Sequence, residues 1–305
     1  MAAARFFDLQ VNGFGGVDFQ GLPTLPEVNL ACRRLREASM HRVLATFITD
    51  HPEAFERRLA LFEAHRLEDP LVAETIVGYH LEGPYLSAEP GYRGAHAAEL
   101  MRDPDWSAFE RQQKAAGGRI RLVTLAPERQ GSEEFIRRAT GSGVRVSLGH
   151  TNASDVHIDA AIRAGATLCT HLGNGCPAEL HRHDNIIQRL LARDELTACF
   201  IPDGIHLPPQ VLRNLVRAKT PGKVILTTDA MSAAGAGPGR YTLGRMELEV
   251  GGDGVVRLPG SPYFAGSALR LDRGVENAAQ WLGLDPALAS AMASEVPASA
   301  LGFSL

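Results

Sequence analysis

The chain has 305 residues, of which 45% are hydrophobic and 22% charged, as is ordinary for a protein that buries one large core. Its 31 lysines and arginines do not exceed its 35 acidic residues, and the formal charge of -4 argues against a nucleic-acid partner held by phosphate neutralisation. The four cysteines have no CxxC spacing, and the sequence has no signal-peptide core and no apolar run of about 18 residues, so we expect a cytoplasmic protein without membrane contacts.

Short runs rich in β-branched residues alternate with amphipathic helical patterns along the chain. These runs lack polar alternation, which indicates strands covered on both faces, as in a parallel sheet. Eight such strands with helices between them predict an α/β fold, a (β/α)8 TIM-type barrel. A doubly wound sheet is the alternative, but Gly13-Phe-Gly-Gly16 does not complete its GxGxxG turn. The predicted strands are Phe6–Val11, Val43–Ile48, Ile76–Leu81, Ile120–Leu125, Val144–Leu148, Thr167–Thr170, Ala198–Ile201 and Val224–Thr227.

Two segments interrupt this alternation. Residues 83–118 form a long excursion after the third strand, rich in Gly and Pro at first and helical later, and loops of that length usually serve a site. Residues 241–258, after the eighth strand, have the pattern of a β-hairpin insertion. Two amphipathic helices are predicted from Leu271 onward. Since no linker or repeat is evident, we expect residues 1–305 to form a single barrel domain.

Polar residues stand where the apolar runs end. The carboxyl ends of parallel strands meet at one rim of a barrel, where such enzymes build their sites. Glu82, His150 and His171 supply a carboxylate and two imidazoles, which suit a divalent ion with one open position, and Asp229 fits a general base. Two purely structural roles remain as alternatives: Glu82 pairs with an arginine, or Asp229 caps a helix that begins at Ala230.

Six ordered motifs resemble those of the N-acetylglucosamine-6-phosphate deacetylases, a family of the amidohydrolase superfamily, and the match covers almost the whole chain. The resemblance implies the barrel, metal-dependent hydrolysis of the acetamide of N-acetylglucosamine 6-phosphate, and a homodimer. It also implies a small flanking β-sandwich, which this chain largely lacks. The motifs are His80-Leu-Glu-Gly-Pro84, Val123-Thr-Leu-Ala-Pro-Glu128, Gly149-His-Thr-Asn-Ala153, Thr170-His-Leu-Gly-Asn174, Asp203-Gly-Ile-His206 and Thr228-Asp-Ala230.

The resemblance assigns roles to the residues at the rim. Glu82, His150 and His171 are implied to bind one divalent metal ion per subunit, with zinc the first expectation and iron, cobalt or manganese the alternatives. Asp229 is implied to be the catalytic acid and base. His96 is implied to polarise the acetyl carbonyl, and its alternative is an exposed loop residue.

The resemblance also implies a substrate-binding set. It consists of Asn174, Gly175, Arg182, Asp203, His206, Gln10 and Asn12. Arg182 falls where the family places a phosphate-binding arginine reached across the dimer interface, and its alternative is an ion pair with Asp184 or Glu179. Gln10 and Asn12 replace the His-x-His pair of the two-metal members, which favours a single metal.

Two rival functions stay open. The first is an amidohydrolase that acts on a different N-acylated sugar or amine, and the unusual stretch from Leu180 to Asn185 supports it. The second is a non-catalytic sugar-binding barrel. Retention of all four of Glu82, His150, His171 and Asp229 speaks against this second rival, because a barrel without catalysis needs no base.

Overall fold

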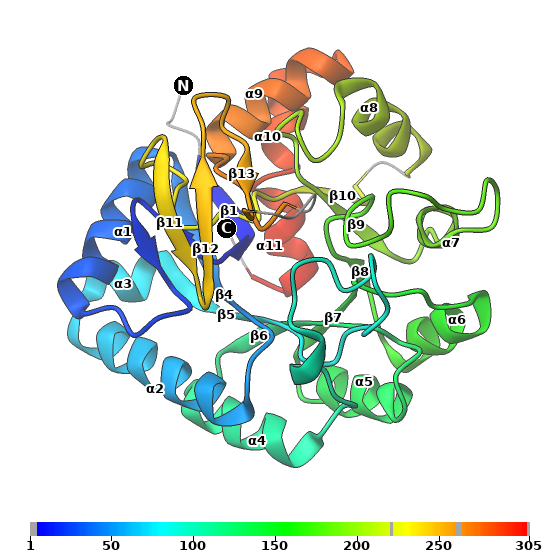
Figure 1. The fold of residues 1–305 in the computed structure, drawn as a ribbon, viewed down its shortest axis with the longest axis horizontal. Coiled ribbons are helices and arrows are strands. Elements are labelled where there is room, and N and C mark those ends of the chain that lie inside the picture. Colours follow the sequence, from blue (N-terminus) through cyan, green and yellow to red (C-terminus); the bar gives the residue numbers. More distant parts are fainter. Residues whose placement is uncertain (1–4, 220–221, 260–263, 304–305) are drawn as a thin grey trace.

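Eight parallel strands, each beside its neighbour in the chain, form the centre of the molecule (Figure 1). The computed structural model describes residues 5–219, 222–259 and 264–303. All eight predicted strands are confirmed, with ends that move by a few residues. They are β1 (Phe6–Val11), β4 (Met40–Ile48), β5 (Ile76–Glu82), β6 (Ile120–Leu125), β7 (Arg145–Leu148), β8 (Leu168–Cys169), β9 (Thr197–Phe200) and β10 (Val224–Leu226).

The last strand returns to the first and closes the sheet. Ala230, just beyond β10, forms a parallel bridge with Val11, and its carbonyl accepts a 2.7 Å hydrogen bond from the Asn12 backbone N–H. The buried carboxylate of Asp8 on β1 accepts hydrogen bonds from the hydroxyls of Thr227 and Thr228 at 2.5 and 2.6 Å. These contacts complete the (β/α)8 barrel that the sequence predicts.

Helices surround the strands on the outside of the barrel (Figure 1). Their apolar residues recur at helical spacing, as in α8, which buries Leu212, Leu215 and Val216 against the core. The helices are α1 (Leu25–Glu37), α2 (Pro52–Glu68), α3 (Pro70–Thr75), α4 (Trp106–Ala115), α5 (Ser132–Gly141), α6 (Asp155–Ala164), α7 (Ile186–Leu191), α8 (Pro209–Ala218), α9 (Leu271–Leu282), α10 (Pro286–Ala291) and α11 (Glu295–Leu301).

The C-terminal tail has three helices where the sequence predicts two. Ser294 leaves helical geometry, with φ −135° and ψ −78°, and so separates α10 from α11. The last helix is part of the core, because Ala298 belongs to one hydrophobic cluster with buried side chains from six barrel strands. These are Phe7, Leu9, Leu44, Leu122, Leu168, Cys199 and Ile225.

The insertion after β10 is a small antiparallel sheet rather than a simple hairpin. The predicted pairing exists between β12 (Met246–Val250) and β13 (Val256–Arg257), but β11 (Gly239–Leu243) adds a third strand. Early in the chain, β2 (Gly13–Phe14) and β3 (Val17–Asp18) form a short pair that was not predicted. Residues 83–118 hold a loop, the 3-10 turn η1 (Ala98–Leu100) and α4, as expected. None of the described helices has the length and apolar character that crossing a membrane requires.

Candidate metal centre

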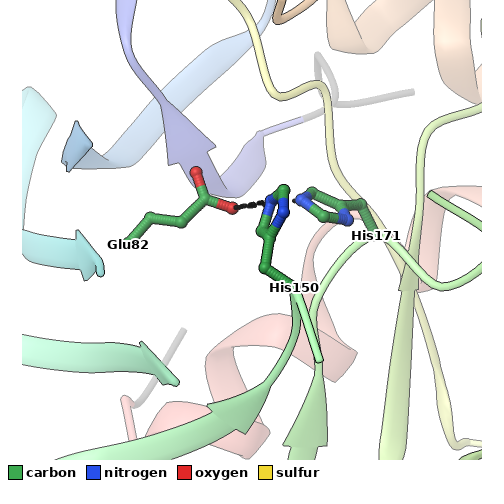
Figure 2. Close-up of side chains that lie close together, drawn as sticks. All are labelled: Glu82, His150 and His171. Atoms are coloured by element: carbon green, nitrogen blue, oxygen red, sulfur yellow. Dashed lines mark hydrogen bonds and ion pairs between the residues drawn. The ribbon is translucent and has the colours of Figure 1, made fainter. Parts of the chain in front are cut away.

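Three potential metal donors converge at the carboxyl ends of β5, β7 and β8. Nε2 of His171 lies 3.0 Å and Nε2 of His150 lies 3.4 Å from Oε1 of Glu82, and all three side chains are buried. Figure 2 shows the carboxylate facing the two rings. One donor atom from each residue lies within 4.8 Å of the other two. The alternative of a Glu82–arginine pair is wrong, since the described ion-pair partners of Glu82 are histidines.

Charge holds Glu82 in the ionised form that binds a metal, whereas the raised pKa of His171 means that a cation must displace a proton there. Burial alone raises the pKa of Glu82, but hydrogen bonds from His150 and His171 outweigh it and hold that pKa well below its usual range. Burial lowers the pKa of His171, but the hydrogen bond and negative charge of Glu82 outweigh it and raise that pKa. Nδ1 of His171 is buried and has no hydrogen-bond partner in the part of the chain that the structure describes. An ionised carboxylate with two imidazoles fits a borderline divalent cation such as zinc.

The backbone is strained at three of the site residues. His150, His171 and Asp229 have φ angles of 50°, 29° and 52°. Residues other than glycine rarely adopt this left-handed region, and such strain clusters at functional sites. Each of the three follows the end of a barrel strand and lines the same cavity. Ala230 forms β-bridges and the following turn begins at Ser232, so no helix starts after Asp229 and the alternative of a helix cap there is wrong.

The ring of His150 is held from three sides. Its Nδ1 lies 2.9 Å from the carbonyl oxygen of Tyr92, so an N–H donated there leaves Nε2 with a lone pair toward Glu82. A Cβ atom added to Gly94 or Gly175, both of which have positive φ, would lie 3.0 Å from the ring. The sequence pointed to Gly175 but not to Gly94 or the Tyr92 carbonyl, which carry no recognisable signal.

His96 is buried against this group, so the alternative of an exposed loop residue is wrong. Its side chain is 7% exposed, and its ring centroid lies 4.5 Å from that of His150. Nδ1 lies 2.9 Å from Oγ1 of Thr49, and Nε2 lies 4.0 Å from Oε2 of Glu82. Burial and the neighbouring His150 lower the pKa of His96 to about 3, so its imidazole is neutral at pH 7.

Asp229 lies on the opposite side of the rim, where β10 meets β1. Its Oδ1 accepts a 2.7 Å hydrogen bond from Nδ2 of Asn12. Burial, and then the negative charge of Glu82, raise the pKa of Asp229 to about 7. A carboxyl group whose pKa lies near neutrality can both accept and return a proton at physiological pH.

A belt of buried polar side chains, which was not predicted, lies on the strands that carry the donors and on β6 between them. Nε2 of His80 lies 2.7 Å from the hydroxyl of Thr124, and the chain of contacts continues through Thr170 to Ser147 at 2.7 and 2.6 Å. Burial lowers the pKa of His80 to about 4. The belt links β5, β6 and β7 with the end of β8 and ties together the strands that carry the donors.

A cavity of about 790 Å³ opens over the donors. Four of the predicted substrate-binding residues line it, namely Asn12, Asn174, Gly175 and His206. Asp203 is not in the lining. It accepts the backbone N–H groups of residues 205 and 206 at 2.8 Å, and its Oδ2 lies 2.6 Å from Nδ1 of His206. Asp203 thus fixes the position of the His206 ring. Gln10 is buried and does not line the cavity.

Arg182 is separate from the cavity of its own chain. It lies on an exposed part of the loop between β8 and α7 and is absent from the cavity lining. Asp184, its suggested alternative partner, pairs instead with Arg189 at 2.6 Å. The described residues include no ion pair between Arg182 and Glu179.

Comparisons with known proteins agree with this geometry. No protein-family model matches the chain. It is 37% identical over 311 residues to N-acetylglucosamine-6-phosphate deacetylase of Mus musculus, and this match covers 98% of this chain and 74% of that protein. It is 33% identical over 272 residues to the same-named protein of Bacillus subtilis, and this match covers 88% of this chain and 67% of that protein. It is also 34% identical over 299 residues to N-acetylgalactosamine-6-phosphate deacetylase of Escherichia coli O157:H7, covering 97% and 77%.

Solved structures give the same result. An aspartate-to-alanine variant of N-acetyl-D-glucosamine-6-phosphate deacetylase from Mycobacterium smegmatis, in complex with N-acetyl-D-glucosamine-6-phosphate, is similar with a TM-score of 0.89 and 33% identity. The match covers 99% of this chain and 78% of that chain. The enzyme from Thermotoga maritima is similar with a TM-score of 0.86 and 28% identity, covering 98% and 78%.

Proposed function

The chain belongs to the N-acetylglucosamine-6-phosphate deacetylase family, and we propose that it hydrolyses the acetamide of N-acetylglucosamine 6-phosphate to glucosamine 6-phosphate and acetate. The observation that carries the proposal is the convergence of the three donors with His96 and Asp229 on one cavity. A barrel that only bound sugar would have no use for a buried carboxyl group of near-neutral pKa beside a metal-type donor set.

In this proposal Glu82, His150 and His171 hold one divalent cation per chain, with zinc as first choice and iron, cobalt or manganese as alternatives. When bound, the cation supplies Lewis acidity that polarises the acyl oxygen and lowers the pKa of water. The proximity of the donors and the hydrogen bond that fixes His150 support this role. The amides of Gln10 and Asn12 are poor ligands, so elemental analysis should find about one ion per chain rather than two.

Asp229 and His96 divide the remaining chemistry. Asp229 takes a proton from the attacking water, whose oxygen bonds to the acyl carbon, and delivers it to the nitrogen as the C–N bond breaks. The products are acetate and the free amine. His96, neutral at pH 7, donates a hydrogen bond from Nε2 to the acyl oxygen, where negative charge develops.

The sugar phosphate is proposed to lie against Asn174, Gly175 and His206. Asp203 contributes by holding His206. Because Arg182 lies outside the cavity of its own chain, we propose that it reaches the phosphate of a neighbouring copy in a homodimer, where an arginine fork matches a dianion.

A second substrate has specific support. N-acetylgalactosamine-6-phosphate deacetylases from two bacteria are each 34% identical to this chain. The two sugars differ in the orientation of one ring hydroxyl, while the acetamide and the 6-phosphate are the same. N-acetylgalactosamine 6-phosphate is therefore the alternative substrate, with unchanged chemistry.

The test is acetate release from both N-acetylhexosamines, each with and without the 6-phosphate, before and after removal of divalent ions by a chelator. We expect turnover of a phosphorylated sugar, loss after chelation, and recovery when zinc is restored. The sugar with the higher kcat/KM identifies the substrate. Release that is faster from unphosphorylated sugars, or unaffected by chelation, would contradict the proposal.

A further inference from the structure

Asn12 has an unbalanced set of hydrogen bonds. Asn12 is 1% exposed, and its Nδ2 donates to Asp229, yet Oδ1 is buried without a partner among the residues that the structure describes. A buried acceptor without a partner costs about 1–3 kcal/mol, so native proteins rarely leave one. Asn12 lines the same cavity as the three metal donors. Because Oδ1 belongs to the amide group that donates to Asp229, the free oxygen lies next to the proposed base.

The surrounding structure fixes the backbone of Asn12, and its bond to Asp229 orients the side-chain amide. Its backbone N–H donates to the carbonyl of Ala230 at 2.7 Å, and its backbone carbonyl accepts from Phe19 N–H at 3.0 Å and from Nε2 of Gln20 at 3.3 Å. A flip of the amide would set Oδ1 against the carboxylate of Asp229, and two acceptors repel each other. Both ends of the side-chain amide are thus oriented before a substrate binds.

We propose that Oδ1 of Asn12 accepts the N–H of the scissile amide, an assignment that rests on the proposed function. The amide nitrogen would then lie beside Asp229, the group that delivers its proton. That N–H is retained throughout, because water adds to the acyl carbon, the C–N bond breaks and the new proton joins the nitrogen. Asn12 would be a catalytic residue with one contact to the substrate and one to the base.

An ester substrate separates this role from simple orientation of Asp229. In 2-O-acetylglucose 6-phosphate an oxygen replaces the N–H, so Oδ1 has nothing to accept. Asn12→Leu has similar volume but neither donor nor acceptor. We expect kcat/KM for the amide to fall about 10–100-fold more than kcat/KM for the ester, as for one lost buried hydrogen bond. Equal losses on the two substrates would overturn the proposal, since Asn12 would then act through Asp229 alone.

A second variant guards against misfolding of the first. Asn12→Asp keeps an acceptor oxygen but loses the donor to Asp229. Both rates should fall, while the ratio of amide to ester turnover should stay within a few-fold of the wild-type ratio. If the ratio of amide to ester turnover falls in Asn12→Asp as far as it does in Asn12→Leu, the proposal is overturned.

The chain offers a matched control far from the cavity. Nδ2 of Asn29 donates to the carboxylate of Asp69 at 2.5 Å, and neither residue lines the site. Asn29→Leu removes the same kind of bond and should leave both rates at wild-type values. Metal content and Tm are measured for every variant. Wild-type protein that releases acetate from neither substrate would reject the proposed function itself, whereas equal losses in Asn12→Leu reject only the role of Asn12.

Discussion

The hydroxyl of Thr49 lies 2.9 Å from Nδ1 of His96, within hydrogen-bond distance of one of the two ring nitrogens. A neutral imidazole has one N–H and one lone pair. When the hydroxyl donates to Nδ1, the proton of the ring lies on Nε2, the nitrogen that faces Glu82 and the cavity. The other acceptor of this hydroxyl, the carbonyl of Glu82, is 3.5 Å away and so competes weakly.

Thr49→Val should therefore weaken catalysis without emptying the metal site. Valine has the shape of threonine but no hydroxyl, so His96 loses the partner that keeps its proton on Nε2. We expect kcat to fall about 10-fold, the value of one hydrogen bond near its upper limit, with unchanged metal content. Thr49→Ser should keep most of the activity. Equal kcat values for the valine and serine variants would show that Thr49 does not control the tautomer.

Asp229→Asn should keep metal and substrate affinity but lose about 10²–10⁴-fold in kcat, the usual contribution of a general base. The amide keeps the shape of the carboxyl group but cannot take a proton from water. Elemental analysis and KM serve as controls. A variant close to the wild-type rate would remove Asp229 from the mechanism.

The same carboxyl group sets the acid limb of the pH profile. Burial and Glu82 raise the pKa of Asp229 to about 7, and a bound cation lowers it, because positive charge favours the carboxylate. The base works only when ionised, so kcat/KM should fall as the pH drops through a value at or below about 7. The residual activity of Asp229→Asn should lack this limb. If kcat/KM of Asp229→Asn still falls at low pH, the titrating group is a residue other than Asp229.

Gly94→Ala should lower metal affinity. The new Cβ would lie 3.0 Å from Cε1 of His150, at a φ of 57°, so either the ring or the loop must move. Gly118→Ala is the matched control, since Gly118 has a φ of 75° but no atom within 4 Å of an added Cβ. Both variants carry the cost of positive φ, of order 1 kcal/mol in stability, but only Gly94→Ala should bind zinc more weakly. Equal zinc affinity in a chelator competition would refute the steric argument.

The sequence could predict the barrel because the strands of a parallel sheet are apolar on both faces and stand out between helices. It could also predict that Glu82, His150, His171 and Asp229 lie at one rim, since parallel strands bring their ends together. It could not predict the contact of Tyr92 with His150, because the backbone carbonyl does that work and any residue has one. The strand β11 was missed because most of its residues are exposed and give little apolar signal.

The stability of the closed barrel should depend on both carboxylate oxygens of Asp8. Both carboxylate oxygens accept hydrogen bonds, Oδ1 from the Thr227 hydroxyl and Oδ2 from the Thr228 hydroxyl. Asp8→Asn leaves one acceptor oxygen for these donors and should cost about 1–3 kcal/mol of folding stability, which thermal unfolding would report as a fall in Tm of several degrees. Asp8→Ala should fall further. An unchanged Tm in Asp8→Asn would mean that the threonine hydroxyls find other acceptors.

Arg182 gives the last prediction, which concerns both the phosphate and the dimer. The residue is exposed and is not part of the lining of its own chain's cavity. A charge-assisted contact to phosphate is worth about 1.5–3 kcal/mol, so Arg182→Ala should weaken affinity for the 6-phosphorylated sugar by about 10- to 150-fold. The unphosphorylated sugar presents no such charge and should be almost unaffected. Equal effects on the two sugars would remove Arg182 from phosphate binding.

The origin of the arginine can be tested by mixing chains with complementary defects, at a concentration of the phosphorylated sugar far below the KM of Arg182→Ala. Arg182→Ala lacks the phosphate contact but keeps the base, whereas Asp229→Asn lacks the base but keeps the arginine. If Arg182 acts across a dimer, a mixed dimer holds one site that combines the intact Asp229 of one chain with the intact Arg182 of the other. Random pairing makes about half of the dimers mixed, each with one complete site of its two, so activity should recover to about a quarter of the wild-type value. If Arg182 serves its own chain, every site in the mixture carries one of the two defects and no recovery follows. Chains that do not associate on ultracentrifugation would contradict the dimer directly.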